Sequence, residues 1–536
     1  MRIPSTDASV ADRGDSRAIR VGFAAIVLAM LPAVLDQTIL ATALPTIATD
    51  LGRLADVSWV VTAYVVSAAA ATPLWGKLAD RHGRKRLLEA SLAIFLAASA
   101  LCGIAQSLPM LIVSRAVQGA AAGGLMTLAY AAVGDLVSPR QRGRYQGYIA
   151  ATFGAAAAIG PLLGGLLVQH ASWRWVFYVN LPVGLLALAG LRLRLPAASS
   201  QSPKAALDVV GAALLATATA ALMLVCVWGG QRYRWASPEI LVLLGVLAIS
   251  ALALVVRTRR AEDPIVPLSL LRSPVVALSS TALFLVTATM FSVTVFVPVF
   301  LQTTTGATPT QAGLLLIPML VGITLSTNLS GRIIERTGRY KPFPLAGLTM
   351  IAAAMVGLAL VVEHPSQVTT GVALALFGLG FGMVGQVLII AVQNGVDRRE
   401  LGVAMAVTSF FRALGGAAGA AILGAIFAAR VGTAGTGTIA VKAAGRADVI
   451  GGVHIVFLVT APIALLALLA VIAIKEIPLR GAGQPPRPDG PHRQPGSRSM
   501  AQEGRPQPAY RTSLSCQAPR GTPPEACPHV SSAARL

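Results

Sequence analysis

The chain has 536 residues, of which 55% are hydrophobic and only 12% are charged, and its mean hydropathy is +0.70. This composition excludes the soluble globular classes and favours a helical membrane protein with many spans. A formal net charge of +21 would ordinarily indicate a nucleic-acid partner. Most Lys and Arg fall in short segments between apolar runs, so the charge reflects membrane topology and we expect no nucleic-acid partner.

The order of apolar runs predicts an all-α integral membrane protein with fourteen spans. Each run is about the length of a helix that crosses a hydrocarbon core of roughly 30 Å. An even number of spans places both ends of the chain in the cytoplasm, and the basic internal segments agree with that orientation. We place the spans at residues 21–45, 57–75, 90–106, 109–134, 145–169, 176–191, 209–228, 240–256, 275–300, 311–331, 343–362, 370–391, 402–428 and 453–474.

The two ends of the chain are polar. Residues 1–20 carry four arginines, and we expect a cytoplasmic segment there rather than a cleaved signal peptide, because the apolar run that follows is too long for one. Residues 476–536 are rich in Pro, Gly, Ser and Arg and cannot bury a core. They are therefore predicted to form a disordered cytoplasmic tail.

One acidic residue, Asp36, lies inside the first apolar run, in the stretch LDQTILATALP (Leu35–Pro45). An ionisable side chain at membrane depth costs at least about 2.5–3.5 kcal/mol on insertion scales, so it faces a cavity or a partner. Asp36 is therefore a candidate for binding a proton or a cationic substrate. The alternative is a buried carboxylate that is permanently paired.

A charged island, GKLADRHGRKRLL (Gly76–Leu88), separates the second and third apolar runs. Two spans joined by so short a segment form a helical hairpin, and its positive charge predicts a cytoplasmic turn. Glycines permit the sharp backbone turns, and one acid stands among the cations. The alternative is a basic loop with no further role. The candidate residues of this segment are Gly76, Asp80, Arg81, Gly83 and Arg84.

The fourth and fifth runs carry further candidates. Arg115 and Gln118 are three positions apart and share one helix face, so they can line a common polar surface; the alternative for Arg115 is a fixed structural charge. The fifth run contains GAAAAIGPLLGG, a helix face with few side chains that favours close helix packing and a bend at proline. Its candidate residues are Gly154, Gly160, Pro161, Gly164 and Gly165.

The charged island recurs at GRIIERTGRYK (Gly331–Lys341), after a shift of 255 residues. The shift places Gly76 on Gly331, and it places Asp80 and Arg84 on Glu335 and Arg339. This internal repeat predicts a duplicated membrane domain. We expect a first six-span half at residues 21–195, two inserted spans at 206–257 and a second six-span half at 275–475.

Arg412 is a third charge at membrane depth, in the stretch SFFRALGGAAGAA. It either closes a ring with Asp36 across the two halves or lies near a cytoplasmic vestibule. The four cysteines have no metal-ligand spacing, and no GxxxxGK[ST] stretch occurs. We therefore expect no metal, no cofactor and no ATP-driven pump.

With these segments in order, the chain resembles the major facilitator superfamily, and within it the fourteen-span branch of drug/proton antiporters, a multidrug-resistance efflux type. The resemblance rests on LDQTILATALP, GKLADRHGRK, the Arg115–Gln118 stretch, the GxxxxxGPxxGG stretch and WRWVFYVNLPVG (Trp173–Gly184), and it covers roughly residues 21–475. It implies the major facilitator fold, with two six-helix halves and two inserted helices.

The resemblance also implies roles for individual residues. Asp80 and Arg84 would belong to a cytoplasmic gate, and Arg115 would take part in proton coupling. The glycine-proline stretch of the fifth run would mark an antiporter rather than a symporter. The antiporter role falls on Gly160, Pro161, Gly164 and Gly165 of this stretch.

The expected function is proton-coupled efflux of hydrophobic or amphipathic, including cationic, drug-like molecules from a bacterial cytoplasm by alternating access. The chain would act in the cell membrane as a monomer and would not be an enzyme. A proton symporter that imports a small solute is one alternative, and a non-transporting membrane sensor is another. The symporter would need more fixed hydrogen-bonding groups in its cavity than the sequence provides.

Overall fold

The computed structural model describes residues 7–51, 54–139, 141–194, 208–230, 233–261, 268–306, 309–363, 366–397, 400–431 and 445–479. Residues 196–206, which we expect to link the first half to the inserted spans, and residues 480–536 of the expected tail at 476–536 lie outside the described residues. Within the described ranges, fourteen helical segments are long and apolar enough to cross a membrane, so the predicted all-α membrane fold is confirmed. The polar N-terminal segment is helical from Asp7 and continues into the first span.

The helices in chain order are α1 (Asp7–Leu51), α2 (Leu54–His82), α3 (Arg84–Gly103), α4 (Leu108–Leu136), α5 (Arg142–His170), α6 (Trp175–Tyr178), α7 (Asn180–Arg194), α8 (Val209–Trp228), α9 (Pro238–Arg260), α10 (Leu268–Arg272), α11 (Pro274–Thr305), α12 (Pro309–Leu314), α13 (Ile317–Thr337), α14 (Pro342–Glu363), α15 (Gln367–Gly395), α16 (Leu401–Val431) and α18 (Arg446–Ala473).

Several helix ends follow directly from the local sequence. Gly83 separates α2 from α3 with φ 90°, and Gly338 ends α13 with φ 71°, a backbone conformation that residues with a β-carbon rarely adopt. At the start of α9, Ser237 accepts a hydrogen bond from the backbone N–H of Ile240, and Pro238 occupies the first helical position. The two repeated islands therefore turn at equivalent glycines.

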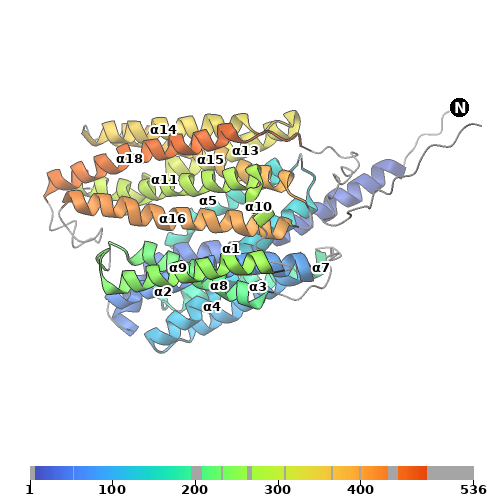
Figure 1. Cartoon of the computed structure of the whole chain (residues 1–536), viewed down its shortest axis with the longest axis horizontal. Helices are drawn as coiled ribbons and strands as arrows, with labels where there is room; N and C mark the ends of the chain where they lie inside the picture. Colours follow the sequence, from blue (N-terminus) through green and yellow to red (C-terminus); the bar gives the residue numbers. More distant parts are fainter. Residues whose placement is uncertain are drawn as a thin grey trace, which may run out of the picture. The chain divides into compact units, whose positions relative to one another are not determined.

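The helices pack as two groups that meet along several helix pairs. In the first group α1 packs on α5 and α7, and α4 packs on α2 and α3. In the second, α18 packs on α11, α14 and α16, and α15 packs on α13 and α14 (Figure 1). The groups meet where α5 contacts α13 and where α2 contacts α16, and the inserted helices α8 and α9 pack on each other with α8 against α2 and α16.

Small residues allow the same crossing in both groups. A β-carbon on Gly160 or Gly164 of α5 would lie 2.0 or 2.2 Å from a threonine hydroxyl of α1. The repeat places these glycines on Gly415 and Gly419 of α16, where a β-carbon would lie 2.1 and 2.8 Å from backbone atoms of α11. Gly165 differs from our expectation, because its β-carbon would meet no atom within 4 Å. Pro161, one helical turn before Gly165, is exposed.

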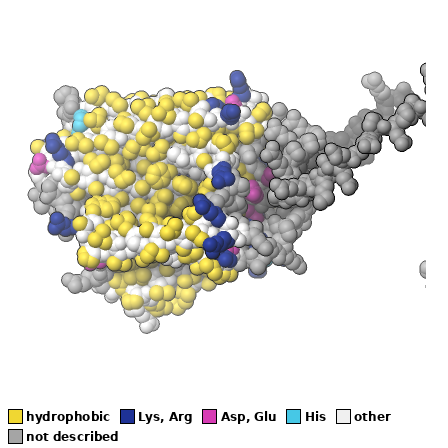
Figure 2. Space-filling model, in the orientation of Figure 1, with side chains coloured by type: hydrophobic (Ala, Val, Ile, Leu, Met, Phe, Trp, Pro, Cys, Tyr) yellow, Lys and Arg dark blue, Asp and Glu magenta, His cyan; other side chains and the backbone are white. Residues whose placement is uncertain are grey.

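The outer surface matches a hydrocarbon environment. Figure 2 shows one face covered mainly by hydrophobic side chains, with Lys and Arg towards the ends of the helices. Large aliphatic side chains such as Leu162, Leu252 and Leu360 are 61–70% exposed. Charged ends and apolar flanks are what a helical bundle needs when lipid surrounds it.

Candidate functional site

The centre of the candidate site is an ion pair between Asp36 on α1 and Arg115 on α4. Arg115 Nη1 donates to Asp36 Oδ2 at 2.5 Å, and the two side chains are 1% and 0% exposed. A charged pair taken out of water persists only when hydrogen bonds satisfy its remaining polar atoms.

Two amide side chains supply such hydrogen bonds. Gln118 Nε2 donates to Asp36 Oδ1 at 3.1 Å, while Gln118 Oε1 accepts from Arg115 Nη1 at 2.7 Å. Asn180 Nδ2, at the start of α7, donates to the same Asp36 oxygen at 3.3 Å. All three groups that contact Asp36 donate hydrogen, which is the environment of an ionised carboxylate rather than a carboxylic acid.

A serine connects the two amides. Ser99 Oγ on α3 accepts from Gln118 Nε2 and from Asn180 Nδ2, each at 3.1 Å, and donates to the carbonyl oxygen of Phe177 at 2.9 Å. Sequence reasoning did not place Ser99 or Asn180 in the site. Ser99 was signalled only by its polarity within an apolar run, and Asn180 also by its place in the stretch WRWVFYVNLPVG.

The guanidinium of Arg115 is fixed from a second side by α2. Its Nε donates to the carbonyl oxygen of Val60 at 3.2 Å, and its central carbon lies 4.2 Å from the centre of the Tyr64 ring. The cation therefore has an anion, an amide, a carbonyl and an aromatic face around it. This buried polar cluster joins α1, α2, α3, α4 and α7 within the first half.

From the sequence, Asp36 and Arg115 could each face a cavity or a charged partner. The structure shows that they are partners of each other. The Asp36 carboxylate is fully buried in this arrangement, so a substrate does not contact it here. Arg412 on α16 lies over the Tyr130 ring of α4, at 5.7 Å from its centre, rather than in a ring with Asp36.

A second cluster lies at the end of the bundle where the Gly83 turn joins α2 and α3, which we call the hairpin end. Asp80 Oδ1 accepts the backbone N–H of Gly402, and Asp80 Oδ2 accepts that of Val403, both at 3.0 Å. These N–H groups belong to the first turn of α16, which has no intrahelical acceptor for them. Asp80 therefore caps a helix of the other half, and its negative charge faces the positive end of that helix.

Glycine makes this contact sterically accessible. A β-carbon on Gly76 would lie 2.6 Å from the carbonyl oxygen of Gly402, and a β-carbon on Gly402 would lie 2.4 Å from Asp80 Oδ1. Any larger residue at either position would push α2 away from α16. The need for glycine at position 76 is thus a matter of helix crossing rather than of the turn that we expected there.

Arg84 balances the charge of Asp80. Its Nη2 lies 3.2 Å from Asp80 Oδ1, and its Nη1 pairs with Asp135 near the end of α4. Arg81 is half-buried in the last turn of α2. Arg84 therefore lies between the carboxylates of Asp80 and Asp135. Of these two, Asp80 also hydrogen-bonds to α16 in the second half.

The second copy of the island is arranged differently. Gly331 of α13 crosses α5 closely at Gly143, where a β-carbon would lie 2.1 Å from the carbonyl oxygen. Glu335, which the repeat places on Asp80, is half-buried and lines a hollow of about 270 Å³ with Arg144, Tyr148, Arg332 and Arg336. Arg339 is exposed, so the two expected gate copies are not equivalent in this arrangement.

One further bridge at the hairpin end was not anticipated. Arg142, the first residue of α5, donates to the carbonyl oxygens of Gln393 at 3.0 Å and Gly134 at 2.5 Å. Gln393 Nε2 donates in turn to the carbonyl oxygen of Tyr130 at 2.9 Å. These bonds join α4 and α5 of the first half to α15 of the second, and the basic segment around Arg142 was their only sequence signal.

Comparison with known proteins identifies the family. A family model described as Major Facilitator Superfamily matches residues 26–420. The chain belongs to the major facilitator superfamily. The predicted family is therefore confirmed, and this major facilitator is a transporter rather than an enzyme. In the described part of the chain, no group of three or more His, Cys, Asp or Glu side chains is placed to hold a metal ion.

Related sequences of this major facilitator come from bacteria and fungi. It is 39% identical over 405 residues to an uncharacterised MFS-type transporter of Mycobacterium tuberculosis, covering 76% of this chain and 59% of the relative's length. It is 34% identical to the multidrug transporter protein MdtP of Bacillus subtilis, covering 76% and 75% of the two chains. It is 33% identical to multidrug resistance protein 3 of the same species, covering 78% and 81%.

Solved structures of major facilitators share the fold. The human organic anion transporter MFSD10 aligns with a TM-score of 0.61 at 17% identity, covering 84% of this chain and 99% of that one. The proton:xylose symporter XylE aligns with a TM-score of 0.60 at 14% identity, covering 85% and 95%. At these identities the likeness concerns the fold alone.

Proposed function

We propose that this transporter exports hydrophobic or amphipathic small molecules, cations included, across a bacterial cell membrane in exchange for protons, acting as a monomer. Relatives named as multidrug proteins, at 33–34% identity, support the substrate class. The glycine-proline stretch of α5 supports antiport through its resemblance to the antiporters of this family, and two of its glycines, Gly160 and Gly164, set the α1–α5 crossing.

The observation that carries the proposal is the buried Asp36 carboxylate and its three donors. These donors come from α4 and α7, so the negative charge of Asp36 holds α1 to both helices. Protonation removes that charge and turns one oxygen into a donor, which the three donors around it oppose. Proton binding therefore favours a different packing of α1, and proton uptake is linked to conformation by that preference.

The hairpin end supplies the second part of an alternating-access cycle. Asp80, Arg142 and Gln393 join the two halves there, so this arrangement is closed at the hairpin end. Rocking of the halves would break these bonds and open that end. Substrate would bind between the halves near the midplane, and proton and substrate would each favour one of the two arrangements.

The orientation in the membrane follows from charge. Arg84 at the Gly83 turn, Arg257 at the end of α9 and Lys341 after α13 lie in segments that the fourteen-span order assigns to one side. Short segments rich in Lys and Arg stay in the cytoplasm, so the hairpin end and both termini would be cytoplasmic. Cysteines introduced at His82 and Arg339 should react with an impermeant maleimide only in lysed cells, whereas cysteines at Gly230 and Gly306 should react in intact cells.

Transport itself is tested in inside-out vesicles from an efflux-deficient bacterium that expresses the chain. An imposed pH gradient, acid inside, should drive uptake of a cationic dye, and collapsing the gradient should release it. A proton symporter would move its substrate in the same direction as the protons, so the dye would leave such vesicles. A sensor would give no flux above that of vesicles without the chain, and either outcome would refute the proposal.

A further inference from the structure

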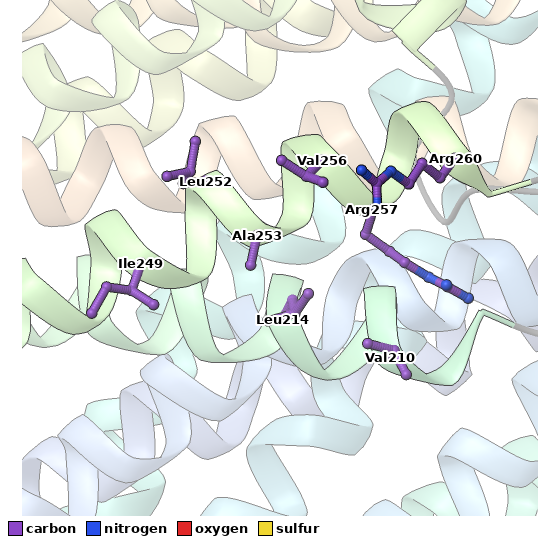
Figure 3. A pocket seen from close by; sticks show the side chains of 8 residues that line it. All are labelled: Val210, Leu214, Ile249, Leu252, Ala253, Val256, Arg257 and Arg260. Atoms are coloured by element: carbon purple, nitrogen blue, oxygen red, sulfur yellow. The ribbon is translucent and has the colours of Figure 1, made fainter.

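A groove of about 540 Å³ lies between the two inserted helices, and the proposed transport cycle does not use it. Its walls are apolar along most of their length, and two arginines stand at one end (Figure 3). The lining residues are Val210 and Leu214 of α8 and Ile249, Leu252, Ala253, Val256, Arg257 and Arg260 of α9.

The groove opens to the bilayer rather than to the interior. Among the candidate spans of the described chain, α9 is the least buried, with 11% of its most apolar window inside the protein. Two residues of the groove, Ile249 and Leu252, are 72% and 68% exposed. Whatever fills the groove therefore comes from the surrounding membrane.

The length of the groove matches one leaflet. Ile249 and Arg260 are 11 positions apart on α9, which corresponds to roughly 16 Å of helix. Half of a hydrocarbon core of about 30 Å is close to that length. The arginines at the end of α9 therefore lie at headgroup depth when the apolar part spans one leaflet.

The arginines can receive a phosphate. Arg257 uses its Nε to pair with Asp208 at 3.0 Å, which leaves both Nη groups of the guanidinium for a ligand. Arg260 lies one turn further along α9, and both arginine side chains are exposed. Two neighbouring guanidinium groups bind the oxygens of a phosphate through paired, charge-assisted hydrogen bonds.

We propose that this groove binds an anionic phospholipid from the leaflet at the hairpin end, with an acyl chain along α8 and α9 and its phosphate on Arg257 and Arg260. Charge selects this occupant, because a zwitterionic headgroup offsets its phosphate with an ammonium and a cationic drug is repelled. Since α8 also contacts α2 and α16, the bound lipid supports the helices that connect the two halves.

The test uses the full chain purified in a neutral detergent, with native mass spectrometry to count bound lipid. Dioleoyl phosphatidylglycerol should bind more tightly than dioleoyl phosphatidylcholine. Arg260→Gln should weaken the phosphatidylglycerol affinity by about fivefold, the effect of one Arg near the membrane surface. The matched control is Arg259→Gln, which removes an equal charge from the same turn but not from the groove, and it should bind phosphatidylglycerol normally.

A second variant, Leu252→Trp, fills the groove without changing charge and should lower binding of phosphatidylglycerol as well. Equal affinities for the two lipids would overturn the proposal, and so would equal losses in Arg259→Gln and Arg260→Gln, which would indicate general surface attraction. A change of oligomeric state in Arg260→Gln, with lipid binding unchanged, would assign the groove to a protein contact and likewise overturn it. None of these readouts requires transport.

Discussion

Asp80 and Gly402 lie 322 positions apart in the chain, yet the Asp80 carboxylate accepts the Gly402 backbone N–H at 3.0 Å. The bond connects the last turn of α2 to the first turn of α16, and hence one half of the transporter to the other. Its strength depends on a single negative charge at a helix N-terminus, where the dipole favours an anion. The closed arrangement at the hairpin end is therefore set in part by one carboxylate.

Replacing Asp80 by Asn should weaken this closure with little effect on folding. The amide oxygen of Asn still accepts one N–H, but the negative charge that strengthens the two hydrogen bonds is lost. We expect this loss to weaken the contact between α2 and α16 by about 1–2 kcal/mol. The equilibrium constant that favours the closed arrangement over the open one should fall by about tenfold. Dye transport by Asp80→Asn should drop accordingly, at a protein level close to that of the unmodified chain.

Glu335→Gln is the matched control for Asp80→Asn, because the repeat places Glu335 on Asp80 while the structure gives it no equivalent role at α5. Transport by Glu335→Gln should stay within about twofold of normal, below the effect of a 1 kcal/mol change. If both variants transported as well as the unmodified chain, the gate role of Asp80 would be refuted, and Gly76–Leu88 would be a basic loop with no further role.

The glycines of α5 allow a second comparison between neighbouring positions. Gly164→Ala places a methyl group 2.2 Å from the Thr42 hydroxyl, and such overpacking costs about 1–3 kcal/mol. Gly165→Ala meets no atom within 4 Å and should be neutral. Thermal unfolding in detergent should show a lower Tm for the first variant only. Equal Tm values would mean that the α1–α5 crossing is looser than described.

The inserted helices carry a pH-dependent contact. Burial acts to raise the pKa of Asp208, but the Gly211 N–H and the Arg257 guanidinium outweigh it, and the pKa lies below its ordinary value. A depressed pKa contributes stability above the unfolded-state value of about 4, and this stability is lost as the pH falls through the folded-state pKa. The Tm difference between the unmodified chain and Asp208→Asn should be constant near pH 7 and shrink below about pH 4. A difference that does not shrink as the pH falls below about 4 would contradict this account.

Much of the fold was predictable from local sequence. The fourteen apolar runs correspond to the fourteen spans. In lipid, the hydrogen bonds of the backbone must be made within a helix, so the length and hydropathy of a run directly indicate a span. The neighbourhood of Arg115 and Gln118 followed from helical periodicity. The same shift of 255 residues pairs Gly160 with Gly415, and a β-carbon on either glycine would clash with the neighbouring helix.

The partners of the charged residues were not predictable in the same way. Asp36 and Arg115 lie 79 positions apart on different spans, and nothing in either span specifies the other. The target of Asp80 is backbone N–H, which has no side-chain signature at all. Asn180 and Ser99 carry no charge and resemble the polar residues found in many packed helices. Tertiary packing determines these contacts.

The Asp36–Arg115 pair leads to the last prediction, which concerns proton coupling. Asp36→Asn removes the anion and leaves Arg115 buried without a counter-charge, a loss of about 3–5 kcal/mol that is expected to impair folding. The double variant Asp36→Asn with Arg115→Gln removes both charges and keeps polar side chains at both positions. It should therefore fold better than the single variant, and a higher Tm in detergent would show this.

With a folded double variant available, the measurement is proton release from detergent-solubilised protein, followed with a pH indicator as a cationic substrate is added. The unmodified chain should release protons, because substrate favours the arrangement in which Asp36 is ionised and paired with Arg115. The double variant should bind the substrate with no release, whereas Asp36→Glu, which keeps a titratable group, should retain part of it. The three side chains that hydrogen-bond to Asp36 are a guanidinium and two amides, and none of them takes up a proton near neutral pH. Normal release from the double variant would therefore assign proton coupling to an acid outside the cluster, such as Asp135 at the hairpin end.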